Sequence, residues 1–472
     1  MKSVRTSVHV PSSATGTDRK HPEDDGDDDT ETPSDISTGY PHGARPRAAP
    51  HHATQTTCEN PWRLTTMADR VTVIGWDGSP LTAAASAALG AATLVAGAAH
   101  HLALPEVPAG AERIRLGSVA LAARRIAAHR GTAVVLADGD PGFFGVVRTL
   151  RAPEFGLEVE VVPAVSSVAA AFARAGMPWD DAQVVVAHPR TLRRAVNVCR
   201  AHTKVAVLTS PGAGPAELGL LLDGVHRSFV ICEELGTARE RVSIVTSDKA
   251  ADHTWRDPNV VIVLGGPAGP GTAGETGGWI SGRDPSAGPR GWTLPADAYG
   301  VDFGEGETQL LRASQLAHLG PRVGDLVWDI GCGSGAFAIE AARAGAAVLA
   351  VDSVLTACAR TDAAARRLGV QLQIVHGTAP HILENLPEPD VVRVGGGGAP
   401  VVSAVADRRP QRIVTHAATR DAAELIGRDL TEHGYGVECA LLQSVELDTR
   451  AWAEKERSVA FLLSGVLPRR GA

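Results

Sequence analysis

The chain has 472 residues, 44% of them hydrophobic, and a formal net charge of −8 at pH 7. This length allows two or three domains with sizeable cores, and the acidic balance gives no general electrostatic footprint for nucleic-acid binding. The 6 cysteines are scattered without a CxxC pair, which argues against a zinc site or a disulfide framework and favours a reducing, cytoplasmic location. No stretch is apolar and long enough to predict a membrane span.

Residues 1–69 differ from everything that follows. They are rich in Pro, Ser, Thr, Asp and His, include the acidic run EDDGDDDTE, and show almost no apolar periodicity. Such a segment cannot bury enough surface to offset the entropy of ordering it, so we predict a disordered tail. It also lacks the apolar core of a signal peptide. Met67 lies just before the first predicted strand, and we expect the residues upstream of it to be dispensable.

Residues 70–265 alternate between predicted strands and helices, which indicates an α/β domain. We expect strands at 71–75, 92–97, 132–137, 158–162, 183–187, 204–209, 228–233 and 259–264. Helices fit at 82–91, 117–129, 166–175 and 214–222. The pair His100-His101 falls at a helix–strand boundary and has no further ligands at metal-site spacing, so we predict no metal site.

Glycine-bearing loops follow several of these strands. Each loop alone is equally well explained as a structural turn, whereas together they form a candidate cofactor site. A serine at the start of a helix is a good N-cap, which accounts for one of these positions independently of any ligand. The candidate cofactor-binding residues are Gly75, Asp77 and Gly78 in the first loop, Gly139, Asp140, Pro141 and Gly142 in DGDPGFFG, and Ser166 and Ser167.

Taken in this order, the loops resemble those of the tetrapyrrole methylase family. The resemblance covers nearly all of 70–265 and is closest at DGDPGFFG and at PAVSSVAAAFARAGMPWDD, and it continues with ELGTARERV at 234–242. It implies a fold of two subdomains, with the first loop and the GDPxFxG loop lining a cleft that binds S-adenosylmethionine (SAM). Where many relatives have a more glycine-rich first loop, this chain has Gly75-Trp76-Asp77-Gly78.

A Gly/Pro/Ser-rich stretch at 266–298 reads as a linker, and 299–472 form a second α/β domain that opens with a helix at 307–319. The segment DLVWDIGCGSG combines a buried strand, Asp329 and a glycine turn made of Gly331, Gly333 and Gly335. A helix and a second strand ending in Asp352 follow. This order of elements is how an open α/β sheet holds an adenosyl cofactor.

The spacing of this turn favours SAM over a nicotinamide or flavin dinucleotide. A dinucleotide site needs GxGxxG, because the pyrophosphate rests on the helix N-terminus. Here the spacing is GxGxG, and the preceding Asp329 would repel a pyrophosphate but suits the positive charges of SAM. Asp352 is placed to accept hydrogen bonds from a ribose diol. A glycine turn that binds nothing is the remaining alternative.

The second domain is similar to Rossmann-like SAM-dependent methyltransferases. Two SAM folds fused in this order resemble the bifunctional precorrin-6Y methyltransferase family of cobalamin synthesis. The resemblance implies a tetrapyrrole (precorrin) substrate, methylation at C-5 by the N-terminal domain, and methylation at C-15 with decarboxylation of the ring C acetate by the C-terminal domain. It further implies a homo-oligomer formed through the C-terminal half. We expect neither a nucleic-acid nor a membrane partner.

Some positions of the second domain depart from this family. Glu307 and Thr308 stand where the relatives usually have a Thr-Lys pair, although Arg312 remains, and His416 stands at an expected Asn. The turn 377–380 lacks the usual acid, and its Thr378 and Ala379 are assigned to cofactor binding by the resemblance; the glycine loop 395–398 is kept. These departures leave open a SAM-binding sensor whose C-terminal half has lost catalysis.

Methyl transfer to an electron-rich pyrrolic carbon requires positioning and desolvation rather than a strong nucleophile. Decarboxylation would benefit from a general acid. The candidate catalytic residues are Arg312, His416 and Glu305, with His376 as a further candidate acid. Because arginine binds carboxylates bidentately, the candidate substrate clamps are Arg312, Arg393, Arg420, Arg239 and Arg241. A methyltransferase for another acceptor is the remaining enzymatic alternative, but the chain lacks a D/N-P-P-Y/F motif and basic patches.

Overall fold

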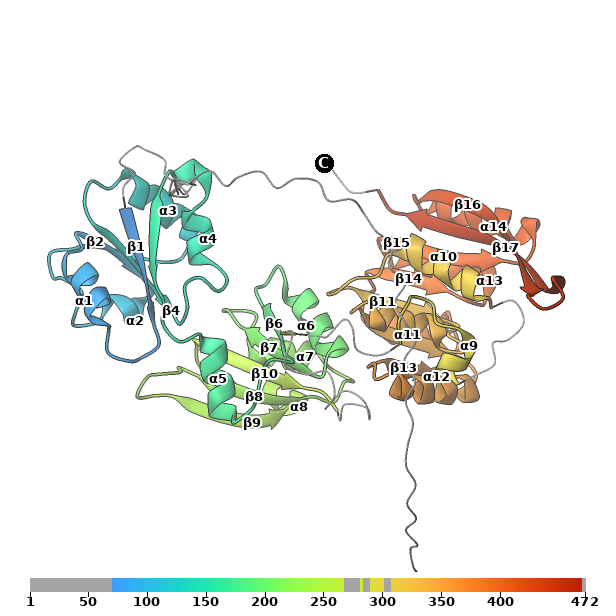
Figure 1. Ribbon diagram of the computed structural model, residues 1–472, viewed down its shortest axis with the longest axis horizontal. Coiled ribbons are helices and arrows are strands. Elements are labelled where there is room, and N and C mark those ends of the chain that lie inside the picture. The colour runs from blue at the N-terminus through green and yellow to red at the C-terminus, as the bar shows by residue number, and fades with distance from the viewer. Residues whose placement is uncertain (1–69, 267–280, 283–288, 301–306, 469–472) are drawn as a thin grey trace, which may run out of the picture. The chain divides into compact units, whose positions relative to one another are not determined.

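The computed structural model describes residues 70–266, 281–282, 289–300 and 307–468, arranged in two five-stranded sheets and one seven-stranded sheet (Figure 1). The α/β class predicted from the sequence is confirmed. The predicted tail at 1–69 and much of the predicted linker lie outside the described residues. Within the described residues, no helix has the length and apolar character needed to cross a membrane.

The first sheet is entirely parallel, with the order β3-β2-β4-β1-β5. Its inner strands are short apolar runs, as expected for strands covered on both faces. The strands are β1 (Arg70–Trp76), β2 (Leu94–Gly97), β3 (Glu112–Arg115), β4 (Ala133–Asp138) and β5 (Glu158–Val162). The connecting helices are α1 (Ala83–Gly90), α2 (Ala99–Leu102), α3 (Val119–Ala128), α4 (Val146–Leu150) and the 3-10 helix η1 (Pro153–Phe155).

The second sheet is mixed, with the order β6-β7-β10-β8-β9, and only β6 and β7 run parallel. Its strands are β6 (Gln183–Val186), β7 (Lys204–Leu208), β8 (Ser228–Glu233), β9 (Arg241–Thr246) and β10 (Asn259–Leu264). Its helices are α5 (Ser167–Ala175), α6 (Leu192–Ala201), α7 (Pro215–Leu221) and α8 (Ser247–Ala251). The helix predicted at 166–175 is α5, which begins one residue later; Ser166 is its N-cap, and its hydroxyl accepts a hydrogen bond from the N–H of Val168.

The third sheet has the order β13-β12-β11-β14-β15-β17-β16, with β17 and β16 antiparallel at one edge. Its strands are β11 (Leu326–Ile330), β12 (Ala347–Asp352), β13 (Gln373–His376), β14 (Val391–Val394), β15 (Arg412–Ala417), β16 (Gly436–Asp448) and β17 (Ala453–Val466). Its helices are α9 (Ala296–Tyr299), α10 (Gln309–Leu319), α11 (Ala336–Arg343), α12 (Leu355–Arg367), η2 (His381–Asn385), α13 (Gly398–Asp407) and α14 (Arg420–Glu432). The strand order reverses between β11 and β14, and ligands of open α/β sheets bind at the carboxyl ends of the strands at such a point.

Packing around α11 begins earlier in the chain than the predicted domain start at residue 299. Leu294 and Tyr299 are buried in a hydrophobic cluster with Ile339 of α11. The N–H of Leu294 and the hydroxyl of Tyr299 both donate to the buried carboxylate of Glu340, at 3.2 and 2.5 Å. The last residues of the predicted linker are therefore part of the fold that carries the glycine turn.

Candidate cofactor sites

The glycine turn after β11 lies at the reversal point of the third sheet. Gly331, Gly333 and Gly335 all have positive φ angles, of +73°, +55° and +78°. A Cβ atom at Gly331 would lie 3.0 Å from the backbone nitrogen of Gly396, and one at Gly335 would lie 2.6 Å from the hydroxyl of Thr361. A Cβ at Gly333 would meet no atom within 4 Å. Packing therefore requires the outer two glycines, whereas the middle one borders open space that a ligand can use.

Asp352, at the end of β12, contacts this turn directly. Its Oδ2 accepts a hydrogen bond from the N–H of Gly333 and its Oδ1 accepts one from Val354, both at 2.9 Å. The loop carrying Thr378 and Ala379 lies beside it, because the N–H of Gly377 donates to the Asp352 carbonyl at 2.9 Å. Each carboxylate oxygen keeps a lone pair free, so the group fits the ribose diol of an adenosyl ligand.

Asp329 is fully buried, and its charge is matched within the chain. Arg393 is its register partner on β14 and donates to its Oδ1 at 2.8 Å. Burial raises the pKa of Asp329 above its ordinary value, and Arg393 opposes that rise. The structure therefore places this carboxylate against a guanidinium beneath the turn, whereas the sequence suggests a carboxylate facing the cofactor's positive charges.

The start of α10 is tied to the same turn. Glu307 accepts hydrogen bonds from the Ser334 hydroxyl on both carboxylate oxygens, at 3.1 and 2.9 Å. Arg312 is only 1% exposed; it donates to the Leu294 carbonyl at 2.6 Å and to Glu307 at 3.5 Å. Glu307, one of the departures from the resembled family, thus contacts the glycine turn. Arg312 lies in the interior and supports Glu307.

His416 is half-buried near the end of β15. The side-chain amide of Gln315 donates to its Nδ1 at 3.2 Å, which leaves the ring proton on Nε2. Burial, with a contribution from Arg393, lowers its pKa to about 4, so the imidazole is neutral at pH 7. His376 instead donates to the Ser353 carbonyl at 3.1 Å and is exposed. Glu305 lies outside the described residues.

The predicted loops of the N-terminal half also come together. A Cβ atom at Gly75 would lie 2.2 Å from the carbonyl oxygen of Gly139 and 2.9 Å from Pro141. One at Gly139 would lie 2.8 Å from the backbone nitrogen of Ser167. Only glycine permits such close approach, so the first loop, the GDP loop and the start of α5 form one cluster at the carboxyl end of the first sheet.

Asp77 links two of these loops. Its Oδ1 accepts a hydrogen bond from Ser79 at 3.0 Å, and its Oδ2 accepts one from Val165 at 3.1 Å. Burial raises the pKa of Asp77, but these backbone hydrogen bonds outweigh burial and hold it below its ordinary value. Next to it, Gly78 packs so closely that a Cβ would lie 1.9 Å from the Gly236 carbonyl. In the GDP loop, Asp140 accepts from the N–H of Gly142 at 2.8 Å.

Comparison with known proteins assigns each half of the chain to a protein family. Residues 76–251 match the tetrapyrrole (corrin/porphyrin) methylases, and residues 301–450 match the precorrin methyltransferase domain. The precorrin-6Y C(5,15)-methyltransferase (decarboxylating) of Sinorhizobium sp is 34% identical over 311 residues, which cover 63% of this chain and 71% of that protein. The chain belongs to this family. It is a SAM-dependent C-methyltransferase.

Shorter relatives are similar to parts of the chain. The cobalt-precorrin-7 C(5)-methyltransferase of Salmonella typhimurium is 36% identical over 192 residues, which cover 39% of this chain and 92% of that protein. The probable cobalt-precorrin-6B C(15)-methyltransferase (decarboxylating) of Pyrobaculum calidifontis is 34% identical over 130 residues, covering 25% of this chain and 67% of that protein. The two activities that the Sinorhizobium name combines are thus carried by separate chains elsewhere.

In this member of the precorrin-6Y methyltransferase family, the five candidate arginine clamps lie in different environments. Arg312 and Arg393 are buried in contacts with their own chain. Arg239 pairs with Glu234 at 2.5 Å. Arg241 and Arg420 are exposed at the ends of their elements. Although paired, the Arg239 side chain is 74% exposed, so Arg239, Arg241 and Arg420 are open to solvent, whereas Arg312 and Arg393 are not.

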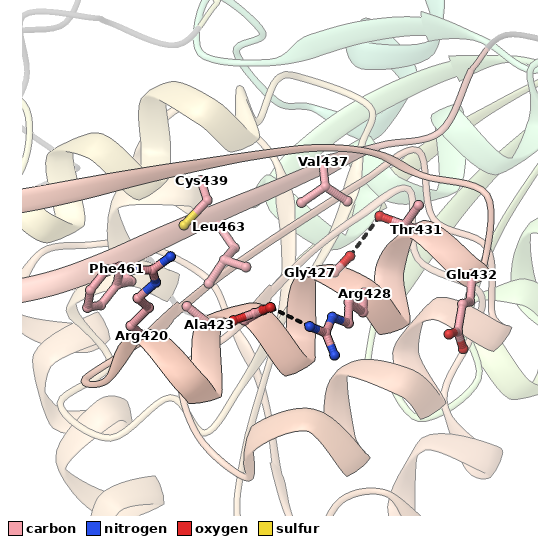
Figure 2. Close-up of a pocket in the computed structure, with 11 residues that line it drawn as sticks. Arg420, Ala423, Gly427, Arg428, Thr431, Glu432, Val437, Cys439, Phe461 and Leu463 are labelled. Carbon is pink, nitrogen blue, oxygen red and sulfur yellow. Dashed lines mark hydrogen bonds and ion pairs between the residues drawn. The ribbon is translucent and has the colours of Figure 1, made fainter.

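A groove of about 650 Å³ lies elsewhere in the third sheet's domain, along α14 and against β16 and β17 (Figure 2). Arg420 lines one part of it beside Phe461, while Thr431 and Glu432 line the part near the end of α14. Neither the glycine turn nor Asp352 contributes to its lining. This groove is therefore distinct from the candidate SAM site.

Sequence reasoning missed two contacts at these sites. It assigned Arg393 to the substrate, whereas Arg393 neutralises Asp329; neighbouring strands with opposite charges at equivalent positions were the available signal. It also treated Glu307 only as a departure from the resembled family, whereas the Glu307 carboxylate accepts hydrogen bonds from the Ser334 hydroxyl of the glycine turn. Both pairings join residues far apart in sequence, so the strand order had to be known first.

Proposed function

We propose that this enzyme methylates precorrin-6Y twice and decarboxylates it, with one reaction centre in each half. Residues 70–265 carry C-5 methylation, and residues 299–472 carry C-15 methylation and loss of CO2 from the ring C acetate. The observation that carries this division is the presence of a separate glycine-lined loop cluster in each half, one around Gly75 and Gly139 and the other around Gly333. The relatives named for C(5) alone and for C(15) alone support the same division.

The residues around each cluster fit the methyl donor. SAM supplies a methyl group bonded to a positively charged sulfur. In the C-terminal half, the open space at Gly333 and the carboxylate of Asp352 accommodate its adenosyl part. In the N-terminal half, Asp77 and the loop of Gly139 to Gly142 form the corresponding cradle. The protein's contribution is to hold the acceptor carbon in line with the methyl group and to exclude water.

For the decarboxylation we assign His416 a role at the substrate. Departure of CO2 leaves an electron pair that the macrocycle must take up, and protonation of the ring next to the acetate arm assists this. His416 presents a protonated Nε2 while its Nδ1 is held by Gln315. Its neutral state at pH 7 suits hydrogen bonding to the ring better than transfer of a proton from an imidazolium. Glu305 remains the candidate acid, and Arg420 is the candidate carboxylate clamp in this half.

We also propose that the enzyme self-associates through its C-terminal half. The long hairpin of β16 and β17 exposes Leu441, Val445 and Val459, which are 59%, 40% and 47% accessible. A contiguous apolar strand surface of this kind favours contact with a second copy. Sedimentation of the full chain would show a species larger than the monomer. Leu441→Lys should shift it toward the monomer, and an unchanged distribution would contradict this surface.

The decisive experiment incubates the full chain with SAM and precorrin-6Y and follows the product by mass spectrometry. Two added methyl groups with loss of one CO2 support the bifunctional assignment. One added methyl group without CO2 loss would mean that only the N-terminal half is active. SAM binding without any product would favour a sensor, and turnover of an unrelated acceptor would favour another methyltransferase.

A further inference from the structure

A carboxylate lies between two imidazoles at the carboxyl end of the first sheet. His100 and His101 are consecutive residues of α2, and Asp138 is the last residue of β4, directly before Gly139 of the GDP loop. The Nε2 atoms of His100 and His101 lie 2.8 and 3.0 Å from the same Asp138 oxygen. From the sequence, the histidine pair has no visible third partner, because Asp138 belongs to a different element.

The hydrogen bonds define which nitrogen of His101 carries its proton. The backbone N–H of Ala98 donates to His101 Nδ1 at 3.2 Å, so that atom has no proton and Nε2 carries it. The side chain is 1% exposed and therefore keeps this arrangement. A transition metal would need the lone pair of Nε2. Although the three donor atoms lie within 4.8 Å of one another, the cluster is therefore suited to sharing protons rather than to holding a metal ion.

His100 differs from its neighbour because it is partly open to solvent. Its Nε2 donates to Asp138, so its Nδ1 is the proton-accepting atom of the ring. The side chain is 39% exposed and lies 6.1 Å from the ring of Trp76. The carbonyl of Trp76 in turn accepts from the N–H of Gly139 at 2.7 Å. His100 thus lies beside both loops that form the N-terminal cofactor cluster.

The charged groups around His100 raise its pKa above the ordinary value. The hydrogen bond to Asp138 is the largest influence and raises the pKa of His100, burial opposes the rise, and the Asp138 charge and the more distant Glu234 add to it. Glu234 is itself paired with Arg239 and Arg256. A raised pKa makes the neutral imidazole a stronger proton acceptor.

We propose that Nδ1 of His100 accepts the proton released during methyl transfer in the N-terminal half, with Asp138 and His101 as positioning residues. This inference rests on the proposed C-5 methylation. The acceptor carbon forms a new C–C bond as the S–CH3 bond breaks, and that bond's electron pair stays on sulfur. The C–H bond at the same carbon then breaks, its electrons return to the macrocycle, and the proton goes to His100. One methyl group enters and one proton leaves, so charge and atoms balance.

The active form of His100 is the neutral imidazole. The rate of C-5 methylation should therefore fall as the pH decreases through the pKa of His100. Asp138→Asn removes the group that raises this pKa, so the acidic limb of the pH–rate profile should move to lower pH. It should also lower the rate, because an amide can hold the wrong tautomer of His100. A purely structural role for Asp138 would lower the rate without moving the limb.

The test uses the full chain, with C-5 and C-15 methylation distinguished by fragmentation of the product in mass spectrometry. His100→Ala should slow C-5 methylation by about 100-fold, the lower end of the usual contribution of a general base. C-15 methylation and CO2 loss should be unchanged, as should binding of the demethylated donor by calorimetry. Added imidazole should restore part of the C-5 rate. The matched control is His253→Ala, which should behave like the parent enzyme. His253 is exposed, and among the aromatic pairs of the described residues its ring contacts only Trp255.

Other outcomes would overturn the proposal. A C-5 rate within threefold of the parent, or a slow variant that imidazole does not rescue while its donor binding is intact, would remove His100 as proton acceptor. Loss of C-5 methylation on treatment of the parent enzyme with a chelator would show that the cluster holds a metal ion instead. If the parent enzyme itself does not methylate C-5, the proposed function fails, and this inference fails with it.

Discussion

At the scale of single residues, the glycines of the turn after β11 differ in what a side chain would meet. Gly333→Ala adds a methyl group that contacts no protein atom, so its effect on folding should be limited to the left-handed backbone, about 1–2 kcal/mol. Its effect on the cofactor should be larger, because the methyl group occupies the ligand's space. We expect calorimetry to show at least a tenfold weaker affinity of the C-terminal site for the demethylated donor.

Gly434→Ala is the matched control for this change. Gly434 has a φ of +87° and open space around it, but it lies in the turn between α14 and β16. Urea unfolding should show similar losses of stability for both variants, with donor affinity reduced only by the change at Gly333. Equal affinities in the two variants would mean that the turn does not approach the cofactor.

The burial of His416 makes a prediction about pH. Its pKa is about 4 in the folded chain, against an ordinary value of 6.5. The unfolded chain therefore binds more protons between these values, and stability from the neutral histidine is fully present above pH 6.5 and lost as the pH falls toward 4. His416→Gln removes this contribution. The difference in unfolding free energy between the two proteins should be constant above pH 7 and change steadily below 6.5; a constant difference throughout would refute the assigned pKa.

At the scale of elements, the N-terminus of α10 connects helix stability with cofactor binding. Thr308 caps this helix, its hydroxyl accepting from the N–H of Leu311 at 3.2 Å, and the neighbouring Glu307 contacts Ser334 of the turn. Thr308→Ala should cost about 1 kcal/mol of stability, as N-cap removals usually do. It should also weaken donor binding, because Glu307 loses its fixed support.

The cap of α14 provides the comparison. Thr419 accepts a hydrogen bond from Ala422 at 3.3 Å in the same geometry, but its helix does not contact the glycine turn through a residue like Glu307. Thr419→Ala should therefore reduce stability by a similar amount while leaving the calorimetric affinity unchanged. If both variants bind the donor as tightly as the parent, Glu307 is not part of the cofactor site.

The elements that could be predicted from sequence are those with a strong local pattern. β5, β8 and β10 have the predicted bounds; β8 and β10 are apolar runs, and β5, with the sequence EVEVV, alternates Glu and Val. β3 was missed because its sequence, ERIR, is polar, and it lies at the edge of the first sheet, where one side of the strand needs no partner. β9, with the alternating sequence RVSIVT, was missed at the edge of the second sheet. Edge strands are defined by their neighbours more than by their own composition.

The same limit applies to side chains. The glycine turn and Asp352 could be predicted because both follow strands in a known order of elements. His100 could not be assigned, because it lies within the short helix α2 rather than at a helix–strand boundary, and its partner Asp138 comes from β4. The contact of Glu307 with Ser334 likewise depends on how α10 packs against the turn. Contacts between elements require the tertiary arrangement, which one sequence does not provide.

At the scale of the whole molecule, both halves contain the same local arrangement, on different sheets. Each has a carboxylate that binds two backbone N–H groups beside a glycine loop: Asp77 with Ser79 and Val165, and Asp352 with Gly333 and Val354. Each carboxylate fixes a loop that would otherwise have to be ordered by the ligand, which lowers the entropic cost of binding. Since the sheets are distinct, the loops held by Asp77 and by Asp352 should bind the donor independently.

Independence predicts how many donor molecules one chain binds. Calorimetry of the full chain with the demethylated donor should give two sites per chain. Asp77→Ala should remove only the N-terminal site and Asp352→Ala only the C-terminal one, and each variant should lose one of the two methylations of precorrin-6Y. Asp448→Ala is the control, because Asp448 binds the N–H of Arg450 at 2.8 Å in the turn between β16 and β17, away from both loops. It should keep two sites. A single site in the parent enzyme, or loss of both sites from one substitution, would mean that the halves share one cofactor pocket.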